Sequence, residues 1–264
     1  MKLRLILVCL SLLLSLLIGY AMSGRVDAYV DTRAHRLLLG LSMDTLKEAR
    51  WQRDRDLFVA RAESLGAQVL VQSANSDDTQ QMRDIQSLLS NGVDVLVIVP
   101  HNGQAMARAV ELAHETQTPV IAYDRLITDC ELDLYVSFDN LRVGRMQAQY
   151  LVDTLPVNRT SRIVRIYGAK TDHNAFLFKQ GQDEVLTPHI ESGRIEVVHE
   201  DWAQNWKAEN AKKITNAAIT NHGATFDAIL ASNDGTAGGA IQALLEEGLA
   251  GKVVVTGQDA DLIA

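Results

Sequence analysis

Residues 93–99 read VDVLVIV, an apolar stretch with Asp94 as its single polar residue. A short run that is rich in β-branched residues and free of glycine and proline is typical of a β-strand. Because both faces of this strand are apolar, we expect it to lie in the centre of a sheet that is covered on both sides. The stretch therefore predicts an α/β fold with a parallel sheet.

Strand-like runs alternate with helix-length amphipathic segments on both sides of residues 93–99. This alternation is typical of parallel sheets with helices on both faces. In the first half we expect strands at residues 37–43, 68–72, 93–99, 120–123 and 134–138, and helices at 45–65, 79–90 and 104–115.

The same pattern begins again near residue 140 and predicts a second α/β half. Here we expect helices at residues 140–155, 175–186, 207–220 and 236–247, and strands at 162–167, 194–199, 226–230 and 252–256, with Thr187-Pro188 and Glu247-Gly248 among the helix stops. We expect two lobes, residues 36–139 and 140–264, that are joined near residues 138–140. The last expected strand is followed by only a few residues, so we expect the second lobe to be incomplete.

The composition favours a globular protein that binds small molecules. The chain has 264 residues, of which 47% are hydrophobic, so it can bury a substantial core. Its formal charge of -8 and its pI near 5.4 argue against a nucleic-acid partner, which would require a basic surface. Cys9 lies in the N-terminal apolar segment and Cys130 is alone in the rest of the chain, so a processed chain could form no intramolecular disulfide. We expect no metal site and no cofactor.

The N-terminus has the features of an export signal. Lys2 and Arg4 precede an uncharged, leucine-rich stretch at residues 5–23, and small residues flank Tyr20 at a site suitable for cleavage after Ala21. Residues 5–23 are also long enough to remain as a membrane anchor, with residues 24–35 as a polar tether. Both alternatives place the rest of the chain outside the cytoplasm, in the periplasm or an equivalent extracytoplasmic compartment.

Polar residues follow several of the expected strands directly. Asp124 and Arg125 follow residues 120–123, Asn233 follows residues 226–230, and Asp259 follows residues 252–256. In an open parallel sheet, ligands bind beyond the carboxyl ends of the strands. A carboxylate and a guanidinium at such an edge can accept and donate hydrogen bonds to the hydroxyl groups of a neutral ligand. The alternative for Asp124 and Arg125 is a simple ion pair at the edge of the sheet.

Other segments add candidates for the same site. Arg50 offers a planar set of donors and Trp51 an aromatic face, although the charged residues 53–56 are more typical of a solvated helix face. Asp172 and Asn174 precede an apolar helix, and capping of that helix would explain one of the two. Of Trp202 and Trp206, we expect one to pack in the core or an interface and the other to stack on a ligand. The glycines of residues 235–239 match no phosphate-binding motif, and we expect them to allow close packing of helix and strand.

Several stretches together resemble one family. They are RWQRDRD (residues 50–56), AESLGA (62–67), GVDVLVI (92–98), AYDR (122–125), SFDN (137–140), SND (232–234) and GQDADL (257–262). In these residues the chain resembles the D-xylose-binding proteins of bacterial ABC sugar transporters, which belong to the type I periplasmic binding proteins. The resemblance runs from about residue 39 to residue 262.

The resemblance implies two lobes that close on a pyranose. By family position, the ligand-binding residues would be Arg50, Trp51, Asp124, Arg125, Asp172, Asn174, Trp206, Asn233 and Asp259. His173 stands where the family often has asparagine, which leaves room for a changed sugar preference. The family's C-terminal region, which completes the second sheet and contributes a lysine to the site, has no counterpart in this sequence.

We therefore expect a non-enzymatic sugar receptor, with D-xylose as the ligand, that delivers its sugar to the permease of an ABC transporter. The alternative is a membrane-anchored xylose sensor that partners a histidine kinase. A repressor effector domain shares the fold, but the leucine-rich segment stands where a DNA-binding helix-turn-helix would be needed. No nucleophile-base pair indicates an enzyme, since His173 has no partner near it in sequence.

Overall fold

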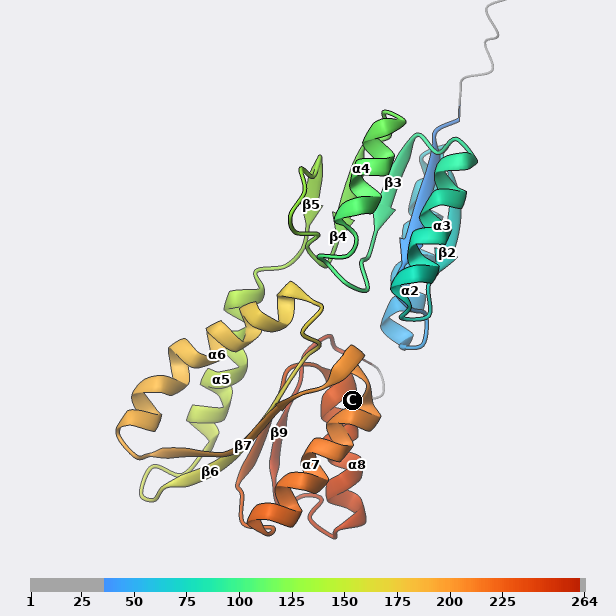
Figure 1. Ribbon diagram of the computed structural model, residues 1–264. Helices are drawn as coiled ribbons and strands as arrows, with labels where there is room; N and C mark the ends of the chain where they lie inside the picture. Colours follow the sequence, from blue (N-terminus) through green and yellow to red (C-terminus); the bar gives the residue numbers. More distant parts are fainter. Residues whose placement is uncertain (1–35, 262–264) are drawn as a thin grey trace, which may run out of the picture. The chain divides into compact units, whose positions relative to one another are not determined.

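The computed structural model of the protein describes residues 36–261 (Figure 1). The predicted signal or anchor segment and the predicted tether, residues 1–35, lie outside the described residues. Within residues 36–261, no helix is long and apolar enough to cross a membrane.

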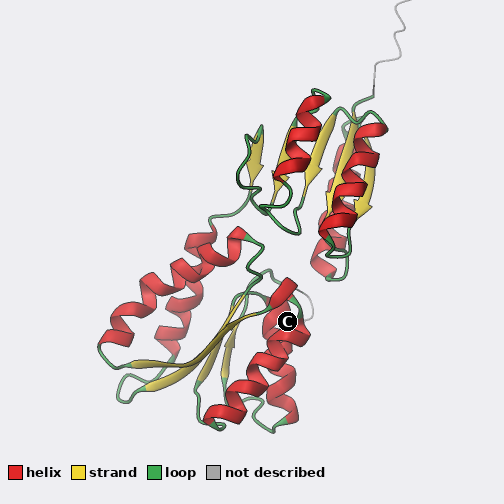
Figure 2. Cartoon of the chain, in the orientation of Figure 1, coloured by secondary structure: helices red, strands yellow, loops and turns green. Residues whose placement is uncertain are grey.

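Helices and strands alternate along the described chain, as the sequence predicts (Figure 2). In chain order the elements are β1 (Leu38–Met43), α2 (Ala49–Ser64), β2 (Gln68–Ser73), α3 (Asp78–Ser90), β3 (Val95–Ile98), α4 (Ala107–Glu115), β4 (Val120–Tyr123), β5 (Leu134–Val136), α5 (Asn140–Thr154), β6 (Ser161–Tyr167), α6 (His173–Glu191), β7 (Ile195–Trp202), η1 (Gln204–Trp206), α7 (Ala208–His222), β8 (Ala228–Ala231), α8 (Asp234–Glu246) and β9 (Val254–Thr256).

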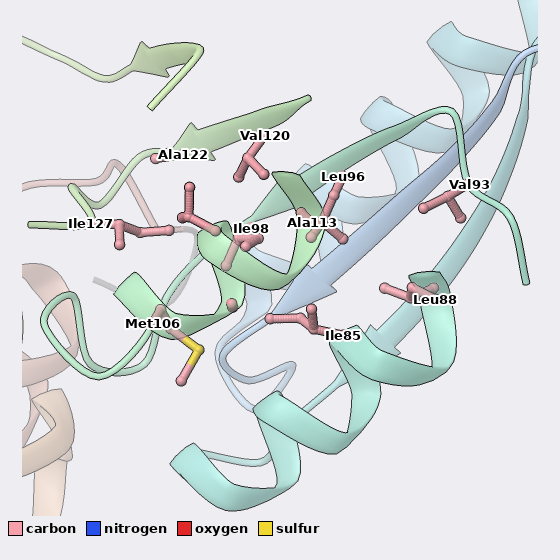
Figure 3. Close-up of a cluster of buried hydrophobic side chains, with 12 residues drawn as sticks. Ile85, Leu88, Val93, Leu96, Ile98, Met106, Ala113, Val120, Ala122 and Ile127 are labelled. Carbon is pink, nitrogen blue, oxygen red and sulfur yellow. The ribbon is translucent and has the colours of Figure 1, made fainter. Parts of the chain in front are cut away.

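The first sheet has five parallel strands in the order β2-β1-β3-β4-β5, with β3 at its centre. Successive side chains of a strand point to opposite faces. Leu96 and Ile98 of β3 pack in a buried cluster with α3 and α4 (Figure 3), whereas Val97 packs in a second cluster with α2. Burial of one such side chain stabilises the fold by about 1.5–3 kcal/mol. The predicted central strand covered on both sides is confirmed, but it spans Val95–Ile98 and not the whole of residues 93–99.

The second sheet has four parallel strands in the order β7-β6-β8-β9. Val164 and Ile166 of β6 pack with apolar residues of α7 and α8. Ile163, on the opposite face of the same strand, packs with α5 and α6. Each described sheet is therefore flanked by helices on both faces, and the predicted fold class, parallel sheets flanked by helices, is confirmed. The predicted lobe boundary between residues 139 and 140 falls in the short connection between β5 and α5 and stays a prediction.

Small residues let helices approach each other closely in the second half. A Cβ atom on Gly144 of α5 would lie 2.2 Å from the carbonyl oxygen of Phe178 in α6. A Cβ atom on Gly239 of α8 would lie 2.0 Å from the carbonyl oxygen of Ala208, the first residue of α7. The prediction that the glycines of residues 235–239 serve packing of helix on strand is therefore wrong for Gly239, because its close neighbour is a helix.

Helix α6 departs most from the predicted boundaries. The stop expected at Thr187-Pro188 is wrong, since the helix continues through Pro188 to Glu191. Proline in a helix removes one N–H donor, and here it does so in the last turns, where few intrahelical bonds remain to be lost.

Candidate functional site

A cavity of about 60 Å³ lies among the loops and helix starts that follow the carboxyl ends of strands from both sheets. This is several times the roughly 10–15 Å³ that one ordered water requires. All nine residues predicted from the sequence line it: Arg50, Trp51, Asp124, Arg125, Asp172, Asn174, Trp206, Asn233 and Asp259. Residues that were not predicted to bind the ligand also line it, among them Asp44, Glu48, Phe138, Asn140, Phe178, Asn205, Gln258 and Asp261.

Arg50 lies in the first turn of α2 and joins residues of both sheets. Its guanidinium donates to the carboxylate of Asp124 and, through Nη1, to Oδ1 of Asp259 at 3.3 Å. Burial alone would lower the pKa of Arg50, but the charges of Asp124 and Asp259 outweigh it and hold this pKa above its ordinary value. Arg50 therefore stays charged in the cavity and connects α2 to the segment that follows β9.

Arg125 is buried and held between two carboxylates. Nη1 donates to Oδ2 of Asp44 at 2.8 Å, and Nε lies 3.0 Å from Oδ2 of Asp172. Burial opposes the charge of Arg125, yet Asp172 and Asp44 raise its pKa above the ordinary value. The sequence alternative of an Asp124–Arg125 ion pair at the sheet edge is wrong, because each of the two pairs with other partners.

Asp124 has an unusual backbone that turns its side chain and carbonyl into the site. Its φ of 65° is left-handed, a conformation that costs a non-glycine residue about 1–2 kcal/mol. The Asp124 N–H continues the sheet by donating to the Val136 carbonyl at 2.7 Å. Its own carbonyl accepts hydrogen bonds from Ser137 at 2.6 Å and from Nδ2 of Asn174 at 3.0 Å. These bonds offset the strain and fix the carboxylate in place.

Asp172 serves both as a helix cap and as part of the cavity. Its Oδ1 accepts a hydrogen bond of 2.9 Å from the N–H of Asn174 at the start of α6. Its Oδ2 accepts one of 3.0 Å from Nε1 of Trp206 and also faces Arg125. Burial raises the pKa of Asp172 above its ordinary value, although the charge of Arg125 opposes the rise.

Asn174 is not a cap. Its side chain donates to the Asp124 carbonyl and accepts from Nδ2 of Asn140 at 2.9 Å, so it links the second sheet's first helices to the end of β4. The sequence predicted that capping of the helix would explain one of Asp172 and Asn174. Capping of α6 explains Asp172, whereas Asn174 has a different role.

Asn233 and Asp259 form the remaining polar side of the cavity. Asn233 caps α8 in a capping box with Thr236, which orients its amide, and Nδ2 donates to Oδ2 of Asp259 at 3.5 Å. Burial, with smaller contributions from the charges of Asp124 and Asp234, raises the pKa of Asp259 to about 6, although Arg50 opposes the rise. The protonation of Asp259 therefore changes between mildly acidic and neutral pH.

Two tryptophans supply the aromatic walls. Trp51 is 5% exposed, and its ring lies beneath the guanidinium carbons of Arg50 and Arg125 at 4.3 and 5.3 Å. Trp206 meets Phe178 edge-on with ring centroids 6.3 Å apart. It also covers Gly168, where a Cβ atom would lie 2.0 Å from the indole ring.

Trp202 lies outside the cavity lining and stacks on Tyr167 and Phe176, with centroids 4.9 and 4.8 Å away. Trp202 is half-buried and packs on aromatic side chains, and its predicted place in the core or at an interface stays a prediction. Trp206 is the tryptophan of this pair that lines the cavity.

Some cavity residues were not predicted, and of Asp44, Glu48 and Asn205 only Asp44 had a clear local signal. Asp44 could have been found, because it follows β1 directly and meets the same strand-end criterion as Asp124. Glu48 lies in the connection before α2, and Asn205 lies in the short element η1 with a φ of 54° that no sequence pattern indicates. The predicted solvated face of α2 is present at Arg55 and Asp56, which form an exposed ion pair of 2.7 Å.

The cavity offers hydrogen-bond acceptors, guanidinium donors and aromatic faces, a combination suited to a polyhydroxylated ligand. In the part of the chain that the structure describes, no group of three or more His, Cys, Asp or Glu side chains is placed to hold a metal ion.

Comparison with known proteins gives the chain a family and a fold. The model of the periplasmic binding protein domain matches residues 39–264. The chain is 48% identical over 233 residues to the D-xylose-binding periplasmic protein of Escherichia coli (strain K12), an alignment that covers 88% of this chain and 70% of that protein. It is 49% identical to the D-xylose-binding periplasmic protein of Haemophilus influenzae, over 86% of this chain and 68% of that protein.

Solved structures agree with these relatives. An ABC transporter solute binding protein from Clostridium phytofermentans with bound β-D-glucose superposes with a TM-score of 0.80 at 31% identity, covering 86% of this chain and 74% of the other. A carbohydrate transporter solute binding protein from Chloroflexus aurantiacus in complex with D-glucose gives a TM-score of 0.77 at 32% identity, covering 84% and 73%.

Proposed function

Because this chain belongs to the periplasmic binding protein family, we propose that it is an extracytoplasmic sugar receptor that binds D-xylose in the cavity described above and delivers it to an ABC transporter permease. The observation that carries the proposal is the convergence of the nine predicted residues on one cavity. They come from segments up to 209 positions apart in the sequence, as Arg50 and Asp259 do. Such convergence supports a ligand site rather than a set of unrelated surface ion pairs.

The chemistry of the cavity fits a neutral pyranose. Asp124 and Asp259 would accept hydrogen bonds from sugar hydroxyls, while Arg50 and Arg125 would donate to ring or hydroxyl oxygens. The indole face of Trp51 or Trp206 would pack on the C–H side of the ring. Ion pairs within the first half, Arg50 with Asp124 and Arg125 with Asp44, would hold these groups in position before a sugar arrives, which would lower the entropy cost of binding.

Delivery would depend on movement between the two sheets and their helices. Residues 138–140 connect β5 to α5, and short connections of this kind absorb hinge rotation in two-lobed binding proteins. Arg50 already contacts Asp259, and Arg125 already contacts Asp172, so these pairs join the two halves in this structure, and opening of the lobes to admit a sugar would separate them. The closed form would then present the surface that a permease recognises.

The sensor alternative depends on residues 5–23 as an anchor, and these lie outside the described residues. Nothing in residues 36–261 favours a kinase partner over a permease, so transporter delivery remains the proposal.

Isothermal titration calorimetry tests the sugar. We expect D-xylose to bind at least about tenfold more tightly than D-ribose, L-arabinose or D-glucose, because one mismatched buried polar group costs about 1–3 kcal/mol. Circular dichroism melting on the same sample shows that the protein is folded. A folded protein that releases no heat with any of the four sugars would refute the proposal.

A further inference from the structure

His101 stands at the same edge of the first sheet as the cavity residues Asp44 and Arg125. The three residues follow β3, β1 and β4, which are neighbouring strands. Because the strands are parallel, their carboxyl ends meet at one edge and bring these side chains together. His101 is 8% exposed and lies outside the cavity lining. It is therefore a buried titratable side chain that supports the cavity from behind.

The ring of His101 holds one oxygen of Asp44. Nδ1 of His101 lies 2.9 Å from Oδ1 of Asp44. Burial alone would raise the pKa of Asp44, but the hydrogen bond with His101 and the charge of Arg125 outweigh it and hold this pKa below its ordinary value. The carboxylate is therefore ionised at neutral pH and can only accept hydrogen bonds, so Nδ1 of His101 must carry the hydrogen.

The other oxygen of Asp44 holds Arg125. Oδ2 of Asp44 accepts a hydrogen bond of 2.8 Å from Nη1 of Arg125. The same Nη1 lies 3.2 Å from the carbonyl of Pro100, the residue before His101, and donates to it. On its other side, Nε of Arg125 lies 3.0 Å from Asp172 in the second half. His101 is thus the outer end of a continuous row of polar contacts that passes through three cavity residues.

A buried glutamine of α3 fixes the backbone around His101. The N–H of His101 donates to Oε1 of Gln81 at 2.8 Å, and Nε2 of Gln81 donates to the Val99 carbonyl at 2.8 Å. Gln81 is fully buried, and both ends of its amide are used. The ring of His101 therefore meets Asp44 from a rigid support, which is what a site of defined geometry requires behind the groups that touch the ligand.

We propose that His101 is a positioning residue of the sugar site, which orients Asp44 and, through Asp44, fixes the guanidinium of Arg125 for contact with the sugar. Without the donor of His101, Asp44 loses one of its two anchors and is free to rotate, and Arg125 loses its fixed partner. A hydrogen-bonded network of this kind depends on each of its members, including those that never touch the ligand. The proposal rests on the proposed function, because Arg125 must first take part in sugar binding.

Calorimetry of D-xylose binding at pH 7.5 compares the wild-type protein with His101→Leu and His101→Asn. Leucine and asparagine are of nearly the same size, but only asparagine carries an N–H donor in place of Nδ1. We expect His101→Leu to weaken D-xylose binding about tenfold and His101→Asn to bind within about threefold of the wild-type protein, since the second variant keeps a hydrogen bond to a charged group. A role in packing alone predicts equal losses for the two variants.

The matched control is His114→Leu. Nε2 of His114 also lies 2.9 Å from a carboxylate, that of Asp133, but the pair is exposed and lies outside the cavity lining. We expect this variant to bind D-xylose like the wild-type protein, and melting curves show whether each variant is folded. The inference is overturned if His101→Leu binds D-xylose as tightly as the wild-type protein, or if His101→Leu and His101→Asn weaken binding equally. Receptor function would stand in both cases, whereas a folded wild-type protein that binds no sugar overturns the proposed function itself.

A second measurement applies if His101→Leu does not fold. NMR of the wild-type protein with ¹⁵N-labelled histidine detects the Nδ1–H group of His101, which is assigned by its absence from His101→Asn. We expect this signal to shift when D-xylose is added, because contact of the sugar with Arg125 is transmitted through Asp44. A signal that stays unchanged while calorimetry reports binding would overturn the inference.

Discussion

Replacement of Asp259 by asparagine should stabilise the protein at neutral pH and weaken sugar binding at the same time. The Asp259 side chain is 12% exposed. Burial raises its pKa to about 6, with added effects of Asp124 and Asp234, even though Arg50 favours the ionised form. Ionisation of Asp259 therefore costs more free energy in the folded protein than in the unfolded chain. The ionised carboxylate nevertheless lies where it can accept hydrogen bonds from a ligand.

The sign and size of the effect follow from the pKa. The ordinary pKa of the carboxyl is 3.8, so the folded protein holds this proton more tightly than the unfolded chain does. The stabilising contribution of the protonated Asp259 carboxyl to the free energy of unfolding is fully present below about pH 4. This contribution decreases as the pH rises toward 6 and is lost above pH 6. A shift of about two pKa units corresponds to about 3 kcal/mol. Asparagine replaces one acceptor oxygen by a donor beside Arg50 and Asn233, so we expect a net gain of about 1–2 kcal/mol at neutral pH.

Thermal unfolding of Asp259→Asn and the wild-type protein at pH 7.5 and at pH 4.5 measures this gain. For a chain of this size, 1–2 kcal/mol raises Tm by about 2–8 °C. We expect the rise at pH 7.5 and almost none at pH 4.5, where the wild-type carboxyl is protonated. Asp153→Asn, at an exposed position of α5, serves as a control that should show neither change.

Calorimetry of the same variant should show D-xylose affinity reduced at least about tenfold, because the carboxylate acceptor is lost. A lower Tm at pH 7.5, or an equal shift at both pH values, would refute the assignment of the ionisation cost to Asp259.

Two further changes probe how the cavity is held together. Gly168→Ala would place a methyl group where the Trp206 ring lies, so we expect the indole to be displaced and D-xylose affinity to fall about tenfold by calorimetry; unchanged affinity would show that this ring position is not needed. Asp44→Asn removes one of the two carboxylates that hold Arg125 and leaves a buried charge less compensated. We expect a loss of about 3–5 kcal/mol in urea unfolding together with weaker sugar binding, and a variant as stable as the wild-type protein would contradict this role of the pair.

The fold was predictable because it rests on local patterns. Residues 93–99 are apolar on both faces, and a strand with that pattern must lie between two layers of helices. Boundaries were less predictable: α6 passes through Pro188, since the loss of one hydrogen bond near its end is offset by the packing of the helix as a whole. The helix-to-helix contact of Gly239 was also missed, because a glycine indicates close approach without indicating to what.

The candidate site was predictable to the extent that it lies at strand ends. Asp124 and Asp259 follow β4 and β9, and parallel strands bring such residues to the same edge of their sheets. The partners of each residue were not predictable. Trp206, for example, reaches Asp172 through a backbone with a φ of 56°, which no local sequence pattern indicates.

The sequence by itself determined which segments form strands and helices and which polar side chains stand at their ends, because these depend on hydrophobic period and turn residues within a few positions. Only the tertiary structure decided that Arg50 meets Asp259 and that Arg125 lies between Asp44 and Asp172. Such pairs depend on the packing of whole sheets and helices, which places side chains from distant segments within hydrogen-bond distance, and no local pattern encodes that arrangement.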